Sequence, residues 1–197
     1  KEKRVVAYHE AGHAIVTTCL GSADAVQKIS IVPRGIAALG YTIQLPTEDR
    51  YLVMKKELEE RLASLLGGRV AEEVFFNDIS TGAQNDLARA TDVARAMVKE
   101  YGMSSMGLSS YERPHNPFLK GDAWMPNEKE YSEQTAAEID AEVRRILEKA
   151  HDTAKGVLET KRDKVEALAA LLLEKEVVER DEFLKVVACD APASQEA

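Results

Sequence analysis

Near its start the chain carries two of its four histidines in one stretch, RVVAYHEAGHAIV, at residues 4–16. No proline interrupts this stretch, and it predicts an α-helix from about Glu2 to Leu20 that ends at the following glycine. On such a helix His9 and His13 lie about 40° apart, with Cβ atoms roughly 5–6 Å from each other. Both imidazoles can therefore reach a single Zn²⁺ at about 2.0–2.1 Å.

Glu10 directly follows the first histidine and projects beside the pair, where it can hold a reacting water molecule. The pattern H-E-x-x-H is the signature of zinc metallopeptidases, in which the glutamate is the general base. A histidine pair can also lie on a solvated face or in a core. With only four histidines in 197 residues, the complete pentapeptide favours a catalytic zinc site.

A catalytic zinc site needs a third protein ligand. Cys19 stands where the longer pattern H-E-x-x-H-x-x-G-x-x-H has its last histidine, but Val16 replaces the helix-breaking glycine. Without that break, Cys19 lies about 240° around the helix from His13 and points away from it. Position alone leaves other candidates open: Glu72, Glu73, Asp86, His115 and His151.

Asp86 is the foremost of these candidates. It shares one helical stripe with the apolar residues Ala90, Val93 and Met97, so its carboxylate is expected to face inward. A buried carboxylate is costly unless it binds a metal or has a polar partner. The alternative is that Asp86 pairs with an arginine, or with backbone amides near the start of its helix.

The remaining periodicity predicts a mainly α-helical (α+β) fold: a helical bundle with one small β-hairpin. Strands are expected at residues 28–33 and 40–45. Thr81 and Gln84 are expected to form a capping box at the start of the third helix. Helices are expected at residues 49–66 (with Gly67 and Gly68 interrupting before 70–76), 81–101, 132–160 and 163–174, the last two as an αα-hairpin. The default interpretation of the two adjacent glycines is close backbone packing or a cap.

Composition narrows the functional classes. A net charge of −8 argues against nucleic acid as the main partner, and no apolar run approaches the roughly 18–20 residues that span a bilayer. Two cysteines provide no disulfide framework and suit a reducing compartment. Residues 1–189 are expected to form one domain and 190–197 a disordered tail. The abrupt beginning just before the histidine helix suggests a piece of a longer protein.

Two further motifs accompany HEAGH at residues 9–13: GGRVAEE at 67–73 and STGAQNDL at 80–87. In order and spacing, the three resemble the peptidase domain of the FtsH family of membrane-anchored, ATP-dependent zinc proteases. The resemblance implies that Zn²⁺ is held by His9, His13 and Asp86, with Glu10 as base. It also implies that Glu72 is an acid behind the ligands that orients one histidine.

The resemblance further implies a homo-hexamer in which an AAA+ ATPase feeds unfolded or misfolded membrane and soluble proteins to the peptidase. It places the domain at the cytoplasmic face of a bacterial inner membrane, or on the matrix or stroma side of an organelle inner membrane. The sequence has no G-x-x-x-x-G-K-[ST] phosphate loop and no membrane segment. ATP and the membrane would therefore act only through AAA+ and transmembrane parts absent from this chain.

A polypeptide substrate is expected to lie along the second strand, with Gly40, Tyr41 and Thr42 as contact residues. The hairpin could equally cap the helical core. Two other functions compete with the main hypothesis: a stand-alone zinc peptidase of small peptides, and a helical assembly module with a structural metal.

Overall fold

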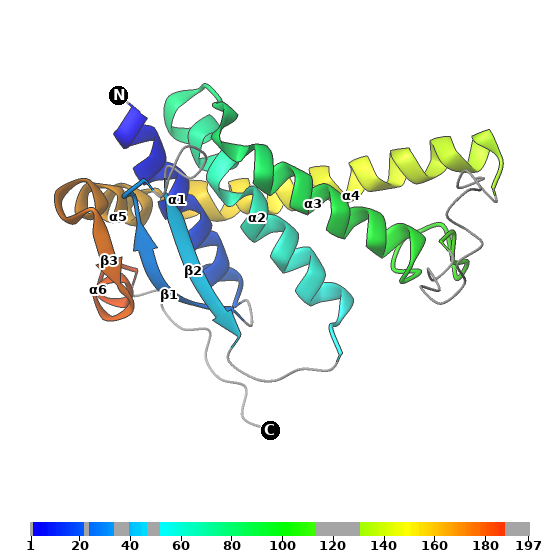
Figure 1. Cartoon of the computed structure of the whole chain (residues 1–197), viewed down its shortest axis with the longest axis horizontal. Coiled ribbons are helices and arrows are strands. Elements are labelled where there is room, and N and C mark those ends of the chain that lie inside the picture. The colour runs from blue at the N-terminus through cyan, green and yellow to red at the C-terminus, as the bar shows by residue number, and fades with distance from the viewer. Residues whose placement is uncertain (1, 22–23, 34–39, 47–51, 113–130, 188–197) are drawn as a thin grey trace, which may run out of the picture.

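The computed structural model describes residues 2–21, 24–33, 40–46, 52–112 and 131–187. It has the predicted mainly helical fold with one small sheet (Figure 1). His115 and the expected tail lie outside the described residues. The elements are α1 (Glu2–Leu20), β1 (Asp24–Ser30), β2 (Tyr41–Pro46), α2 (Lys55–Phe76), the 3-10 helix η1 (Thr81–Ala83), α3 (Gln84–Lys99), α4 (Glu133–Thr160), α5 (Arg162–Lys175), β3 (Val177–Glu179) and α6 (Arg180–Val186).

Helix α1 is the centre of the molecule and lies between the small sheet and α2 (Figure 1). Its residues from Ala7 to Thr17 are all buried. At the crossing with α2, a Cβ added to Gly12 would lie 2.6 Å from the Cβ of Ala71, and one added to Gly67 would lie 2.9 Å from the Gly12 carbonyl oxygen. Glycine at both positions therefore lets the two backbones approach closely.

The prediction that the double glycine interrupts α2 is wrong. The helix continues through Gly67 and Gly68, because close packing on α1 outweighs the roughly 1 kcal/mol by which a glycine disfavours a helix. The helix also begins later than predicted, at Lys55. Its start is fixed by Glu57, whose Oε2 accepts the backbone N–H of Met54 at 2.7 Å.

The sheet has the order β2-β1-β3, with both pairs antiparallel. Ile29 in the central strand is opposite Thr42 on one side and Val178 on the other. β1 begins four residues before the predicted strand, because a bulge between Val26 and Lys28 breaks the alternation that marks a strand. β3 and α6 were not predicted. Among the described residues, β2 is an edge strand.

The two long C-terminal helices agree with the predicted bounds to within one residue. Only Lys161 separates α4 from α5, yet the two helices pack mainly on different neighbours: α4 on α2 and α3, and α5 on α1. The two helices of the expected αα-hairpin therefore lie on different sides of the bundle. The buried Leu158 and Leu168 join both helices to the common core. Among the described helices, none contains an apolar stretch of the length that spans a bilayer.

Candidate metal centre

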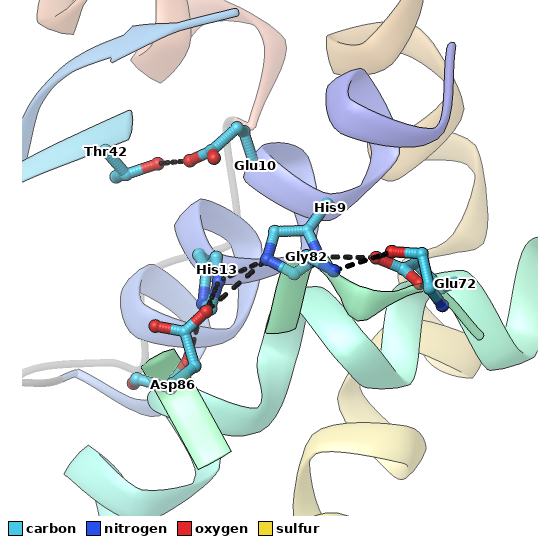
Figure 2. Close-up of polar contacts among 9 residues, drawn as sticks. His9, Glu10, His13, Thr42, Glu72, Gly82 and Asp86 are labelled. Carbon is cyan, nitrogen blue, oxygen red and sulfur yellow. Dashed lines mark hydrogen bonds and ion pairs between the residues drawn. The ribbon is translucent and has the colours of Figure 1, made fainter. Parts of the chain in front are cut away.

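Two histidines and one carboxylate converge beside α1 (Figure 2). The Nε2 atoms of His9 and His13 are 3.1 Å apart. Asp86 Oδ2 lies 3.5 Å from His9 Nε2 and 3.3 Å from His13 Nε2. A tetrahedral zinc ion with bonds of about 2.0–2.2 Å separates its ligand atoms by about 3.3–3.6 Å. The three side chains predicted from the sequence therefore have nearly the mutual spacing that zinc requires.

The other ring nitrogen of each histidine is held by α2. His9 Nδ1 donates to Glu72 Oε1 at 2.7 Å, and His13 Nδ1 donates to the carbonyl oxygen of Ser64 at 2.8 Å. When both rings are neutral, as metal binding requires, each Nδ1 keeps its proton and each Nε2 lone pair can point toward the common position. Such outer hydrogen bonds fix the tautomer and orientation of metal-ligating histidines.

Gly68 forms the wall of α2 next to the histidine rings. A Cβ at this position would meet the Nε2 atom of His9 and would lie 2.5 Å from that of His13 and 2.6 Å from His9 Cδ2. Any larger residue would push the two ligand atoms out of place. The space that a Cβ would fill is thus kept open for the rings, which fits a metal held between them.

Glu72 connects the histidine helix to the segment that carries Asp86. Besides His9, its carboxylate accepts the backbone N–H of Ser80 at 2.6 Å and the Ser80 hydroxyl at 3.0 Å. Ser80 Oγ in turn accepts the N–H of Gly82 at 3.2 Å and begins η1. One buried carboxylate therefore positions both halves of the ligand set.

The predicted capping box is wrong. The cap is Ser80, one residue earlier than Thr81, and it is fixed there by its bonds to Glu72. The N–H of Gln84 donates to the carbonyl oxygen of Thr81 in a 3-10 turn, and α3 starts only at Gln84. Asp86 consequently lies in the first turn of α3, and Ala90 and Met97 of its predicted stripe are buried.

The electrostatics of the centre favour a cation. Burial disfavours a charged imidazole, but hydrogen bonds to Asp86 and Glu72 outweigh it and raise the pKa of His9 to about 9. Burial likewise opposes ionisation of Asp86, yet its contacts with His13 and His9 hold the pKa of this carboxyl well below its usual range. A metal cation between the same groups would take over the role of the proton on His9.

Glu10 projects from α1 toward the sheet (Figure 2). Its Oε2 accepts a hydrogen bond from the hydroxyl of Thr42 at 2.8 Å. The residue Glu10 as a whole is only 7% exposed. Gly40 lies directly against it. The structure therefore brings together Glu10 with two of the three residues predicted to contact substrate, and Tyr41 lies next to them on the same strand.

The other candidate ligands lie elsewhere. His151 Nε2 contacts Glu73 Oε2 at 3.0 Å on the α2–α4 interface, so His151 is paired with an acid. Cys19 packs against the core. Among the described residues, neither Cys19, Glu73 nor His151 belongs to the group of converging ligand atoms.

Sequence reasoning missed three contributors to the centre. Gly68 was visible as half of a double glycine, but only the structure shows that it lies against the histidines and not just against α1. Ser80 was visible within STGAQNDL as a residue able to cap a helix. Ser64 contributes its backbone carbonyl, which no side-chain pattern can reveal.

Comparison with known proteins agrees with this centre. Residues 1–186 match peptidase family M41. The ATP-dependent zinc metalloprotease FtsH of Ralstonia pickettii is 57% identical over 185 residues, which cover 93% of this chain and 26% of that protein. The protein of the same name from Syntrophobacter fumaroxidans is 55% identical over 184 residues, covering 93% of this chain and 28% of the relative.

A third relative, ATP-dependent zinc metalloprotease FtsH 4 of Synechocystis sp., is 51% identical over 184 residues, covering 93% of this chain and 29% of its own length. The chain thus spans less than a third of these relatives. The match extends over the three motifs and nearly all the described elements, and it confirms the resemblance drawn from those motifs. This chain belongs to peptidase family M41.

Proposed function

We propose that this chain is a zinc metalloendopeptidase domain that hydrolyses peptide bonds in polypeptides. His9, His13 and Asp86 hold the zinc ion, and Glu10 is the general base. The observation that carries the proposal is the convergence of the three ligand atoms at 3.1–3.5 Å. The relatives named zinc metalloproteases support the choice of metal and reaction.

Bound zinc supplies Lewis acidity, which polarises the scissile carbonyl and lowers the pKa of water toward about 7. Glu10 accepts the proton of the attacking water and delivers it to the nitrogen of the leaving amine. Glu72 and the Ser64 carbonyl hold the two histidine rings in the tautomer that leaves Nε2 free. The walls of α1 and α2 keep these groups buried, where electrostatic interactions are strong.

The substrate lies extended along the outer edge of β2, which is an edge strand among the described residues, and adds a strand by main-chain hydrogen bonds. Thr42 on this strand contacts Glu10, so a peptide paired with β2 would pass close to the base. Recognition of the main chain tolerates many side chains, which suits an enzyme acting on unfolded or misfolded proteins.

The deciding experiment measures zinc content and casein cleavage for the wild type, Glu10→Gln and the control Glu2→Gln, which changes an exposed residue of the same helix. We expect about one zinc per chain in all three, with cleavage lost only in Glu10→Gln, by about 10²–10⁴-fold. Cleavage at the wild-type rate by Glu10→Gln would overturn the role of the base. Absence of zinc in the wild type would overturn the metal site.

The relatives are named ATP-dependent, and this supports a wider proposal. The domain works in a homo-hexamer next to an AAA+ ATPase, at the cytoplasmic face of a bacterial inner membrane or, as the alternative, on the matrix or stroma side of an organelle inner membrane. Native mass measurement of the zinc-loaded protein tests the assembly. Six copies are expected, whereas a monomer that cleaves short peptides at full rate would favour the stand-alone peptidase. Zinc without any turnover would point to a domain that works only when its ATPase holds the ring, and a closed site with four protein ligands would favour the assembly module.

A further inference from the structure

The geometry points to Thr42 as the residue that positions the Glu10 carboxylate for proton transfer. This inference rests on the proposed function, and it assigns strand β2 a second role in catalysis. Besides presenting an edge to the peptide, the strand holds the base through a side chain. The contact joins two residues that are 32 positions apart in sequence and lie on different elements.

The contact has the form of a dedicated hydrogen bond. The Thr42 hydroxyl donates to Glu10 Oε2 at 2.8 Å. Glu10 is buried and Thr42 is half-buried. A buried carboxylate requires a hydrogen-bond donor to keep its charge at an acceptable free energy.

The second oxygen of the carboxylate meets the backbone of the same strand region. A Cβ added to Gly40 would lie 2.8 Å from Glu10 Oε1, 2.9 Å from Glu10 Cγ and 3.0 Å from the Ser30 carbonyl oxygen. No side chain fits there without displacing the base. Thr42 therefore holds one oxygen, and the absence of a side chain at Gly40 leaves room for the other.

Orientation matters because the last torsion of a glutamate side chain has broad preferences. Without a fixed donor, the plane of the carboxylate would rotate, and its lone pairs would be misaligned with the water proton. Misplacement of a reacting group by about 1 Å can cost about 10²-fold in rate. Loss of the Thr42 hydroxyl should therefore lower kcat while leaving the metal ligands, which α2 and α3 hold, in place.

The test compares Thr42→Val, which keeps the shape and strand preference but removes the hydroxyl, with Thr42→Ser, which keeps the hydroxyl. Thr153→Val is the matched control, because Thr153 is exposed and its hydroxyl donates only to the carbonyl of Lys149 among its described contacts. For each zinc-loaded protein, kcat and KM are measured separately on a fluorogenic peptide. Zinc content and thermal unfolding are measured on the same samples.

We expect Thr42→Val to lower kcat by about 10–100-fold with KM within about twofold. Thr42→Ser should keep kcat within about threefold of the wild type because it retains the donor. Thr153→Val and the zinc content should be unchanged. An unchanged kcat in Thr42→Val would overturn the inference, as would an equal loss in Thr42→Ser.

A binding measurement separates positioning of the base from binding of the peptide. In the inactive Glu10→Gln background, adding Thr42→Val should leave the Kd of the same peptide unchanged. If the Kd instead rises by the same factor by which Thr42→Val lowers kcat/KM, Thr42 binds the peptide and does not position the base. Wild-type cleavage by Glu10→Gln would instead overturn the proposed function itself, so the two failures are distinguishable.

Discussion

The two sides of α1 hold their functional groups in different ways. On the side of α2, His9 and His13 each donate a hydrogen bond to an oxygen of that helix, and Gly68 lies against both rings. On the side of the sheet, Glu10 is held by a hydroxyl on an edge strand. The metal position is therefore built into the packed helical core, whereas the base depends on a strand that also meets the substrate.

This difference implies that metal retention and turnover can be lost separately. Changes on the side of α2 and α3 should remove zinc, and activity should be lost as a result. Changes on the side of β2 should remove activity while zinc stays bound. Changes at Asp86, Gly68 and Glu72 test the metal side of this separation, and a change at Glu142, away from both sides, should alter stability alone.

Asp86→Asn should have the largest effect on zinc. It replaces the carboxylate ligand by a neutral amide next to His9 and His13. Loss of a residue that only hydrogen-bonds to a ligand typically lowers metal affinity by about 10–100-fold, and loss of the ligand itself should lower zinc affinity by more. Competition with a metal indicator measures the affinity. Asp92→Asn, an exposed change on the same helix, is the control. Stoichiometric, tight zinc in Asp86→Asn would contradict its role as a ligand.

Gly68→Ala should also release zinc, by a steric cause. The new Cβ would lie 2.5 Å from His13 Nε2 and would force the rings apart. Gly156→Ala is the matched control, since that helical glycine has nothing within 4 Å and alanine there should add up to about 1 kcal/mol of stability. Zinc content and thermal unfolding of both variants give the answer. A Gly68→Ala protein with full zinc would show that the rings can adjust.

Glu72→Gln should weaken zinc binding by about 10–100-fold. The substitution removes the negative charge next to His9. It also replaces one of the two carboxylate oxygens that accept hydrogen bonds from His9 and Ser80 by an amide NH₂ group, which cannot accept them. The neighbouring Glu73→Gln serves as control, because Glu73 faces His151 on the other side of α2. Zinc affinity should be unchanged there. An equal loss in both variants would mean that α2 is sensitive to any loss of charge.

Glu142→Gln should affect neither zinc nor turnover and should change only stability. The Glu142 carboxylate binds Arg145 at 2.7 and 2.8 Å and accepts the N–H of Ser105 at 2.8 Å. The hydrogen bond with Arg145 lowers the pKa of Glu142 to about 2, against the effect of burial. We expect a loss of about 1–3 kcal/mol in the free energy of unfolding at neutral pH.

The pH dependence gives the sign of this effect. Because the folded pKa lies below the value of about 4.3 in an unfolded chain, the stabilisation is complete above that value and disappears as pH falls toward about 2. The difference between wild type and Glu142→Gln in chemical denaturation should shrink over this interval. The exposed Glu159→Gln on the same helix should show no such change. A difference that stays constant with pH would contradict the assignment.

The sequence was sufficient where one local pattern determines the outcome. The spacing of His9 and His13, the inward stripe of Asp86 and the bounds of α1, α4 and α5 all follow from helical periodicity. Long, strongly periodic helices carry their own signal. The position of Asp86 relative to the histidines needed the family resemblance, because it depends on how α3 packs against α1.

The sequence was insufficient where tertiary contacts override local preference. Gly67 and Gly68 look like a helix break, but they are the surface on which α1 and its histidines rest. The start of α3 depends on Ser80, which is fixed by a carboxylate eight residues earlier. β3 has only three residues, and so short a strand gives almost no periodic signal before its partner is known.

The third strand has a consequence for the order in which the domain is made. The ligands and the base all lie within the first 86 residues, but β1, on which β2 rests, is completed by Val177–Glu179. The N–H of Ile31 likewise donates to the carbonyl oxygen of Glu176 at 2.9 Å. A ribosome adds about 5–20 residues per second, so β3 is synthesised roughly 7–27 seconds after β2. We expect the nascent chain to contain every ligand and the base well before it can hydrolyse peptides. Activity should begin only when β3 has paired with β1.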